Sequence, residues 1–314
     1  GSLEATTVDS GIITLADPLN LSGLGMGDDL TFDLSVAQDG SALVTIDGGI
    51  AFAEIEVAEI TLGTGDDTFD VGNTISRVDD PGTPDVDEAF RTVTILNTGE
   101  GDDVVTVSTA AEGNGLLAVN LEEGDDDFSA AGDGTTPPAT LEMIVFGGEG
   151  TDTIRGGQGN DAIFGDKGQV DYYDDGGTLV TRFGFGLDER SDSPADDSFV
   201  PFPQTDGGFN QARRFLTREH GTGAGDVIDG FAGFDVIFGG AGSDTITAEL
   251  GGKIVLGDQG EANLALFSND VFTVDDASGD ADIIIGGGDG VGNIMLGGAG
   301  ADLITGGSGD DVIL

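Results

Sequence analysis

Aspartates recur at a fixed interval between residues 221 and 257. Asp226, Asp235 and Asp244 are nine residues apart, and an isoleucine follows each of them two places later. Before Asp244 the chain reads G-G-x-G-x-D-x-(apolar)-x, and the full pattern returns at Asp152, Asp161, Asp302 and Asp311. Glycine permits the positive φ angles and close backbone approach of a tight turn. Aspartate adds a hard oxygen donor, so the chemistry that this spacing indicates is cation binding.

The spacing also predicts how the donors come together. A short strand with one inward apolar side chain, followed by a turn, makes a nine-residue unit, and two units make a coil of 18 residues. Equivalent turns of successive coils then stack, as with Asp226 and Asp244. Such a stack offers two carboxylates and several glycine carbonyls, which suits the six to eight oxygen ligands of Ca²⁺ better than Mg²⁺, which retains its waters.

This pattern resembles the calcium-binding repeat of the RTX (repeats-in-toxin) family. The resemblance implies an all-β fold, a right-handed parallel β-roll or β-solenoid with a column of Ca²⁺ along each edge. It also implies type I secretion of an unfolded chain that folds outside the cell, and hence a secreted, extracellular or cell-surface location. The candidate metal ligands of the strict repeats are Asp152, Asp161, Asp226, Asp235, Asp244, Asn293, Asp302, Asp311, Gly148, Gly150, Gly157, Gly159, Gly240, Gly242, Gly298, Gly300, Gly307 and Gly309. Weaker candidates are Asp67, Asp103, Asp126, Asp166, Asp258 and Asp282.

Composition agrees with a calcium-dependent module. The 314 residues carry 60 Asp and Glu against 10 Lys and Arg, a formal charge of -50 that opposes compaction unless cations neutralise it. The 57 glycines raise the conformational entropy lost on folding. Apolar residues at a strict period argue against a disordered acidic tail. Cysteine is absent from the sequence, which excludes disulfides and thiolate metal sites.

The chain divides into three expected regions. Residues 1–60 are expected to form a β-rich N-terminal cap, with Asp39-Gly40 as a hairpin turn, or alternatively a separate small β-sandwich. Residues 61–146 contain a diluted repeat and predict a wide-coil parallel β stack in which bound ions and plain acidic turns are both open. Residues 147–314 are the RTX β-roll. Gly1-Ser2 has the form of a cloning scar, and the chain stops inside a repeat, so we expect part of a longer protein.

Two insertions interrupt the roll, at about 169–220 and 261–280. The first predicts a hairpin around Asp174–Gly177 and a short helix over residues 209–220. Its aromatic residues favour folding back on the roll, with partner binding as the alternative. The second predicts a shorter hairpin from Leu264–Phe267 and Val271–Val274.

Lys253 breaks the pattern, because it stands 18 residues from Asp235 where an aspartate is expected. An ammonium group cannot ligate a cation. We therefore expect a partly exposed ion pair at this turn, worth about 0 to 1 kcal/mol, in place of a metal.

Catalytic chemistry finds little support. The single histidine, His220, lacks the second histidine of H-E-x-x-H, and no G-x-S-x-G sequence occurs. The pairs Asp66-Asp67 and Asp102-Asp103 could serve a glycosidase or lyase, but they lie within the calcium-turn pattern. Acidity disfavours nucleic acid, and the sequence has no run of 18 apolar residues that could span a membrane.

The leading hypothesis is therefore a non-enzymatic calcium-binding structural module of a large secreted or surface protein of adhesin, surface-layer or matrix type. The alternatives are the non-catalytic RTX part of a secreted hydrolase or lyase, and a carbohydrate-binding module. Beyond calcium, the candidate partners are a cell surface, a glycan and further copies of the chain.

Overall fold

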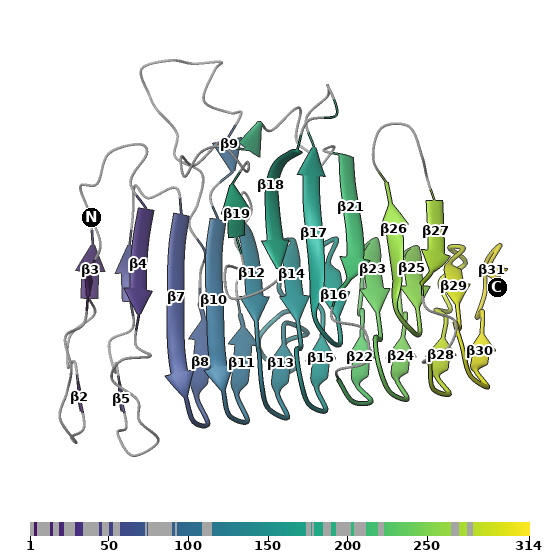
Figure 1. Cartoon of the computed structure of the whole chain (residues 1–314), viewed down its shortest axis with the longest axis horizontal. Helices are drawn as coiled ribbons and strands as arrows, with labels where there is room; N and C mark the ends of the chain where they lie inside the picture. The colour runs from purple at the N-terminus through teal and green to yellow at the C-terminus, as the bar shows by residue number, and fades with distance from the viewer. Residues whose placement is uncertain are drawn as a thin grey trace.

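A computed structural model describes residues 57–72, 74, 93–108, 115–173, 177, 179–184, 212–218, 223–264, 270–274 and 279–314, together with short strands within 3–52, 90–91, 190–192 and 202–203. The described residues form strands and turns and contain no helix. Most strands belong to two parallel sheets and one antiparallel sheet (Figure 1).

The longest sheet is parallel and runs the length of the molecule. Its order is β1 (Leu3–Glu4), β4 (Asp29–Asp33), β7 (Val57–Thr64), β10 (Val93–Glu100), β12 (Leu116–Asn120), β14 (Met143–Phe146), β16 (Ala162–Phe164), β23 (Asp235–Phe238), β25 (Lys253–Leu256), β29 (Ile294–Leu296) and β31 (Val312–Ile313). We call it the long sheet.

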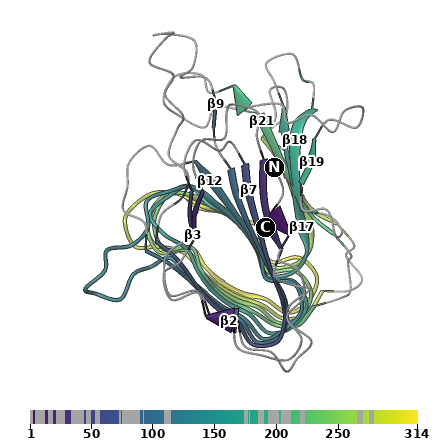
Figure 2. The same cartoon turned by 90° about the vertical axis from the view of Figure 1, so that its left-hand side faces the viewer.

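A second parallel sheet faces the first across the interior. Its order is β30 (Leu303–Thr305), β28 (Ile283–Ile285), β24 (Thr245–Thr247), β22 (Val227–Asp229), β15 (Thr153–Arg155), β13 (Asp127–Ser129), β11 (Val104–Val107) and β8 (Thr68–Val71). We call it the short sheet. Viewed along the stack, the two sheets enclose one elongated interior (Figure 2).

The third sheet is antiparallel and is built from the two insertions. Its order is β19 (Arg190–Asp192), β18 (Leu179–Gly184), β17 (Gly168–Tyr173), β21 (Ala212–Thr217), β26 (Gly260–Asn263) and β27 (Asp270–Thr273). We call it the insertion sheet. Three two-stranded sheets pair β2 (Ile13–Thr14) with β5 (Val44–Thr45), β3 (Leu19–Leu21) with β6 (Ile50–Phe52), and β9 (Phe90–Arg91) with β20 (Phe202–Pro203).

The two parallel sheets differ because only one of them is covered on both faces. Strands of the long sheet such as β14 and β16 are buried at every position. One face, including Ile163 and Ile237, fills the roll interior, while Phe164 and Phe238 stack at 4.9 Å on the opposite face. Strands covered on both faces read as continuous apolar runs. Short-sheet strands such as β24 bury only the central isoleucine.

The insertion sheet supplies the cover for the outer face of the long sheet. Val170, Tyr172, Phe183 and Phe215 are buried in one apolar cluster with the outward residues of the long sheet, including Phe146. The structure therefore has three layers along this part of the roll, and the insertion aromatics that it describes are mostly packing residues.

The three secondary-structure predictions for the insertions have different outcomes. The hairpin around residues 174–177 is confirmed, because β17 pairs antiparallel with β18. The short helix is wrong: Ala212–Thr217 is strand β21, held in register between β17 and β26. The second hairpin exists, but its first strand is Gly260–Asn263 rather than Leu264–Phe267. Sheet pairing overrides the local helical signal because both neighbours of β21 are already extended.

The predicted N-terminal hairpin is also wrong. Strand β4 pairs in parallel with β1 on one side and with β7 on the other, which leaves no edge for an antiparallel partner. The turn itself, Asp39-Gly40, lies outside the described residues. Strands β1 and β4 thus extend the long sheet beyond β7.

Candidate metal centre

Aspartates form a continuous ladder along the edge where the chain passes from the long sheet to the short sheet, at the bottom of Figure 1. In this ladder the backbone N–H of each aspartate donates to Oδ1 of the next aspartate along the stack. The order is Asp67, Asp103, Asp126, Asp152, Asp226, Asp244, Asp282 and Asp302, with N–O distances from 2.7 to 3.1 Å. We call this the first edge.

The register of the first edge is the one that the nine-residue spacing predicts. Val227 pairs with Thr245, so Asp226 and Asp244 occupy equivalent turns 18 residues apart. Asp152 and Asp226 are also neighbours, although 74 residues separate them, because the first insertion lies between. Asp67, Asp103 and Asp126 continue the ladder without strict 18-residue spacing, since their coils carry longer connections on the far side.

Several first-edge aspartates have a second carboxylate oxygen, Oδ2, that takes no part in the ladder. This oxygen is buried and accepts no hydrogen bond from the described residues in each of five aspartates, namely Asp126, Asp152, Asp226, Asp244 and Asp282. A buried acceptor without a partner costs free energy, and buried charges are paired or coordinate metals. These oxygens therefore fit a bound cation.

Burial changes the protonation of the ladder. It raises the pKa of Asp244 to about 9 and that of Asp226 to about 8, with neighbouring carboxylates adding to the shift and the backbone hydrogen bonds opposing it. The pKa of Asp126 is raised to about 8 and that of Asp152 to about 6, chiefly by burial. Without a cation Asp244, Asp226 and Asp126 would hold protons near neutral pH, and a divalent ion would favour their carboxylate form.

Glycines shape the turns at both edges of the roll. Gly240 and Gly242 have φ of +116° and +106°, which other residues rarely adopt. Gly148, Gly150, Gly298, Gly300, Gly307 and Gly309 also have positive φ. Gly157 and Gly159 have no positive φ; at Gly157 a Cβ would lie 2.5 Å from the carbonyl oxygen of Ala139, so close approach is what requires glycine there.

The opposite edge, where the chain returns to the long sheet, carries a shorter and mixed ladder. Backbone N–H groups of Met143, Asp161, Lys253 and Asn293 donate to side-chain oxygens of Asp161, Asp235, Asn293 and Asp311 respectively, at 2.8 to 3.0 Å. We call this the second edge. The amide of Asn293 also donates to Asp311 Oδ1 at 3.1 Å, so its side chain is engaged on both sides.

Lys253 occupies the centre of the second edge. Its Nζ lies 2.7 Å from Asp235 Oδ2, 2.9 Å from the carbonyl oxygen of Gly233 and 2.6 Å from that of Leu250. One carboxylate and two turn carbonyls are the donor types expected around a calcium ion. The expected pair is present, but the expected partial exposure is wrong, because both side chains have no exposed area.

One aspartate lies at the point where each insertion leaves the roll. Asp166 and Asp258 are buried, and each accepts the backbone N–H of an alanine in the next turn, Ala241 and Ala299 respectively. The sequence pattern gives only a weak indication of them, because in the strict repeat this position is a glycine.

Side chains alone do not make the candidate sites. No three Asp, Glu, His or Cys side chains in the described part of the chain are grouped so that they could hold a metal. The backbone carbonyls of the glycine turns would have to complete the ligand shell. His220 lies outside the described residues.

Comparison with known families decides which repeat this is. The model of the RTX calcium-binding nonapeptide repeat matches residues 144–169, 220–252 and 288–314. The repeats in these three segments are RTX repeats. Since RTX nonapeptides are calcium-binding motifs, the ion that they take is Ca²⁺. The matched segments supply the turns of both edges from Gly148 to Asp161 and from Gly223 to Asp244, and those around Asn293, Asp302 and Asp311.

No curated protein and no solved structure matches the chain. The RTX match identifies a calcium-binding repeat module of the kind found in secreted proteins. The described residues include no helix that is long and apolar enough to cross a lipid bilayer.

Proposed function

We propose that this chain is a structural module of a large secreted or cell-surface protein, of adhesin, surface-layer or matrix type, that folds outside the cell when Ca²⁺ binds. The observation that carries the proposal is the first-edge ladder, in which Oδ2 of Asp126, Asp152, Asp226, Asp244 and Asp282 is buried without a hydrogen-bond partner among the described residues. Such an arrangement is unfavourable in a low-calcium cytosol and favourable at extracellular calcium concentrations, because metal binding free energy becomes folding free energy.

The proposed ligands are the carboxylates of the first edge, the second-edge carboxylates of Asp161 and Asp311, the amide oxygen of Asn293, and the carbonyls of the turn glycines. Asp235 is excluded, because the Lys253 ammonium already lies against it. The alternative of a sugar-binding module based on insertion aromatics gains no support from Phe183 and Phe215, which are buried against the long sheet.

The test is calorimetry and far-ultraviolet circular dichroism on calcium-stripped protein. Calcium chloride should bind at several sites per chain and restore β signal that is lost on chelation, and magnesium chloride should do so poorly. An identical spectrum and melting temperature before and after chelation would overturn the proposal.

The site assignment has its own prediction. In Asp244→Asn the amide oxygen can still accept the N–H of Asp226, but one carboxylate charge is lost, so calcium affinity at one site should fall by roughly tenfold or more. Asp270→Asn is the matched control, because Asp270 is exposed on β27. Unchanged calcium affinity and stoichiometry in Asp244→Asn would show that the first-edge ladder is not the binding register.

A further inference from the structure

Both insertions interrupt a first-edge turn at the same point. An unbroken turn has six positions, as in Gly239 to Asp244, with the aspartate last. In the preceding coil Gly165 and Asp166 supply the first two positions, and residues 223–226 supply the other four. The alignment holds because a Cβ on Gly242, at position four, would collide with the backbone of Ala224.

The second insertion repeats this arrangement. Gly257 and Asp258 supply positions one and two, and residues 279–282 supply positions three to six, since a Cβ on Gly300 at position four would collide with the carbonyl of Asp280. Each insertion is thus spliced between positions two and three of a turn, and position two is an aspartate in both.

The aspartate replaces a backbone acceptor. In unbroken turns the N–H at position three donates to the backbone oxygen at position two of the preceding turn, as Glu149 does to Glu122 at 2.6 Å and Glu123 does to Gly99 at 3.1 Å. At the split turns the backbone leaves for the insertion at this position. The N–H groups of Ala241 and Ala299 instead donate to Oδ2 of Asp166 and Asp258.

That bond occupies only one carboxylate oxygen. Asp166 is 4% exposed, and its Oδ1 is buried and accepts no hydrogen bond from the described residues. A Cβ on Gly223 would collide with this carboxylate, so Asp166 faces the far side of its own split turn. The Asp258 carboxylate, 2% exposed, would likewise collide with a Cβ on Gly279 across its split, and its Oδ1 is buried and accepts no hydrogen bond from the described residues.

A hydrogen-bond acceptor alone would not require a charge at this place. An asparagine oxygen could accept the same N–H without burying a carboxylate among others, and Asp166 interacts electrostatically with Asp244 and Asp152. Burial of a further negative charge beside two others is unfavourable unless a cation is present.

We propose that Asp166 and Asp258 are additional calcium ligands at the bases of the two insertions, where a bound ion ties both ends of each insertion to the roll. This assignment rests on the proposed calcium function. The aspartate ligand at position two would be a property of the split turns, where it compensates for the broken backbone, and not of the strict nonapeptide repeat, which has glycine at this position.

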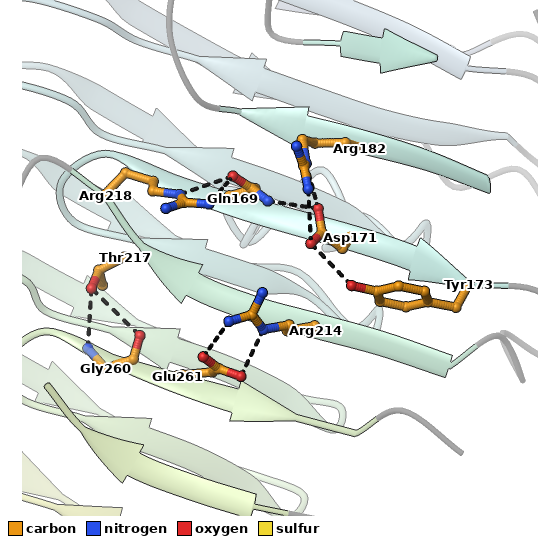
Figure 3. Close-up of polar contacts among 9 residues, drawn as sticks. All are labelled: Gln169, Asp171, Tyr173, Arg182, Arg214, Thr217, Arg218, Gly260 and Glu261. Carbon is orange, nitrogen blue, oxygen red and sulfur yellow. Dashed lines mark hydrogen bonds and ion pairs between the residues drawn. The ribbon is translucent and has the colours of Figure 1, made fainter. Parts of the chain in front are cut away.

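The two calcium-tied bases would act on one common element. Figure 3 shows that the insertions are joined, since Arg214 on β21 forms a two-bonded ion pair with Glu261 on β26 at 2.6 Å. Thr217, near the base of the first insertion, exchanges hydrogen bonds with Gly260, near the base of the second. Calcium at both split turns would therefore clamp the whole insertion sheet against the long sheet.

The test compares Asp166→Asn and Asp258→Asn with wild type and with Asp270→Asn as an exposed control. Each test variant keeps an acceptor for the alanine N–H and removes the charge. In titrations with calcium chloride, each asparagine variant should show a calcium affinity at one site that is lower by roughly tenfold or more. In subsaturating calcium, the backbone amides of β17 and β21 should exchange hydrogen faster than in wild type. In calcium-free buffer each variant should be as stable as wild type or more stable.

Asp166→Ala separates the two roles, because it removes the acceptor as well. Wild-type calcium affinity and exchange in both asparagine variants would overturn the proposal, and a defect confined to Asp166→Ala would assign Asp166 to hydrogen bonding alone. The two bases are independent, so a variant that fails to fold at one leaves the other to decide. Absence of calcium binding by wild type would instead refute the proposed function.

Discussion

At the scale of single residues, Lys253 shows how one substitution changes a repeat. The repeat turns depend on a cation to neutralise buried oxygens, and at this turn the chain supplies its own. The ammonium is held by Asp235 Oδ2 and by the carbonyls of Gly233 and Leu250, with no exposed area on either side chain. Burial raises the pKa of Asp235 to about 6, although the Lys253 charge opposes the shift. This coil therefore has a permanent cation.

Removal of that cation should be costly in calcium and in chelator alike. In Lys253→Met, Asp235 is left as an uncompensated buried charge, so we expect a loss of roughly 3–5 kcal/mol in the free energy of unfolding. Lys167→Met is the matched control: Lys167 lies 2.8 Å from Glu149 with both side chains partly exposed, so its loss should cost about 0 to 1 kcal/mol. Urea unfolding measures both. Equal losses would contradict the buried-pair argument.

Lys253→Asp makes the complementary prediction. It places a second carboxylate at the Asp235 turn, so a calcium site should form there, with stability gained in calcium and lost in chelator. Calorimetry should count one more ion than in wild type. A variant that gains no calcium would show that the lysine does not stand in for an ion.

At the scale of elements, the insertion sheet explains why the long-sheet strands beneath it are so apolar. Long-sheet strands such as β16 and β23 bury both faces only because β17, β18 and β21 cover the outer one. The covering side chains include Tyr172 and Phe183, whose rings meet edge to face at 5.9 Å. The insertions are thus part of the core of this module.

Phe215→Ala tests that cover. Phe215 is 1% exposed, and Arg213 lies over its ring at 5.4 Å. We expect a loss of roughly 3–5 kcal/mol from the cavity and the lost packing. Phe272→Ala on β27 is the control, because Phe272 is 42% exposed and a surface change should stay within about 0.5 kcal/mol. The comparison needs calcium-saturated protein and denaturant unfolding; equal, small effects would mean that the insertion sheet adds little to the stability of the roll.

At the scale of the whole molecule, the ladder makes stability depend on pH in opposite ways with and without calcium. The first-edge carboxyls have folded pKa values of about 6 for Asp152, 7 for Asp282, 8 for Asp226 and 9 for Asp244, all raised chiefly by burial. A raised folded pKa means that the folded state binds more protons than the unfolded chain. Its stabilising contribution is complete below about pH 4 and is lost as the pH rises through the folded values.

Calcium-stripped protein should therefore lose stability from about pH 4 up to about pH 9, and the decline above pH 6 lies beyond the range in which ordinary carboxylates titrate. In excess calcium the decline should disappear or reverse, because ion and proton compete for the same oxygens. Melting temperatures across this range, with and without calcium, measure the effect. A calcium-stripped protein that grows more stable toward pH 9 would contradict the assignment of these carboxylates as buried and unpaired.

The sequence alone was sufficient for the repeat, the ion and the stacking of Asp226 with Asp244. Nine-residue spacing sets the register by itself, since each turn has only one equivalent neighbour 18 residues along. Spacing could not show that Asp67, Asp103 and Asp126 continue the same ladder, because their coils differ in length and only sheet pairing aligns them. Nor could it show that residues 212–217 are extended, because neighbouring strands impose that conformation.

Tertiary structure alone decided the environment of the charges. The sequence paired Lys253 with Asp235, but whether that pair lies in water or in the interior depends on what the neighbouring coils cover. In the same way, Asp166 and Asp258 occupy positions at which the strict repeat has glycine, so the sequence gives them no clear role. Only the fold brings each of them beside a turn that an insertion has split, where a side-chain oxygen takes the place of a missing backbone oxygen and a charge remains for an ion.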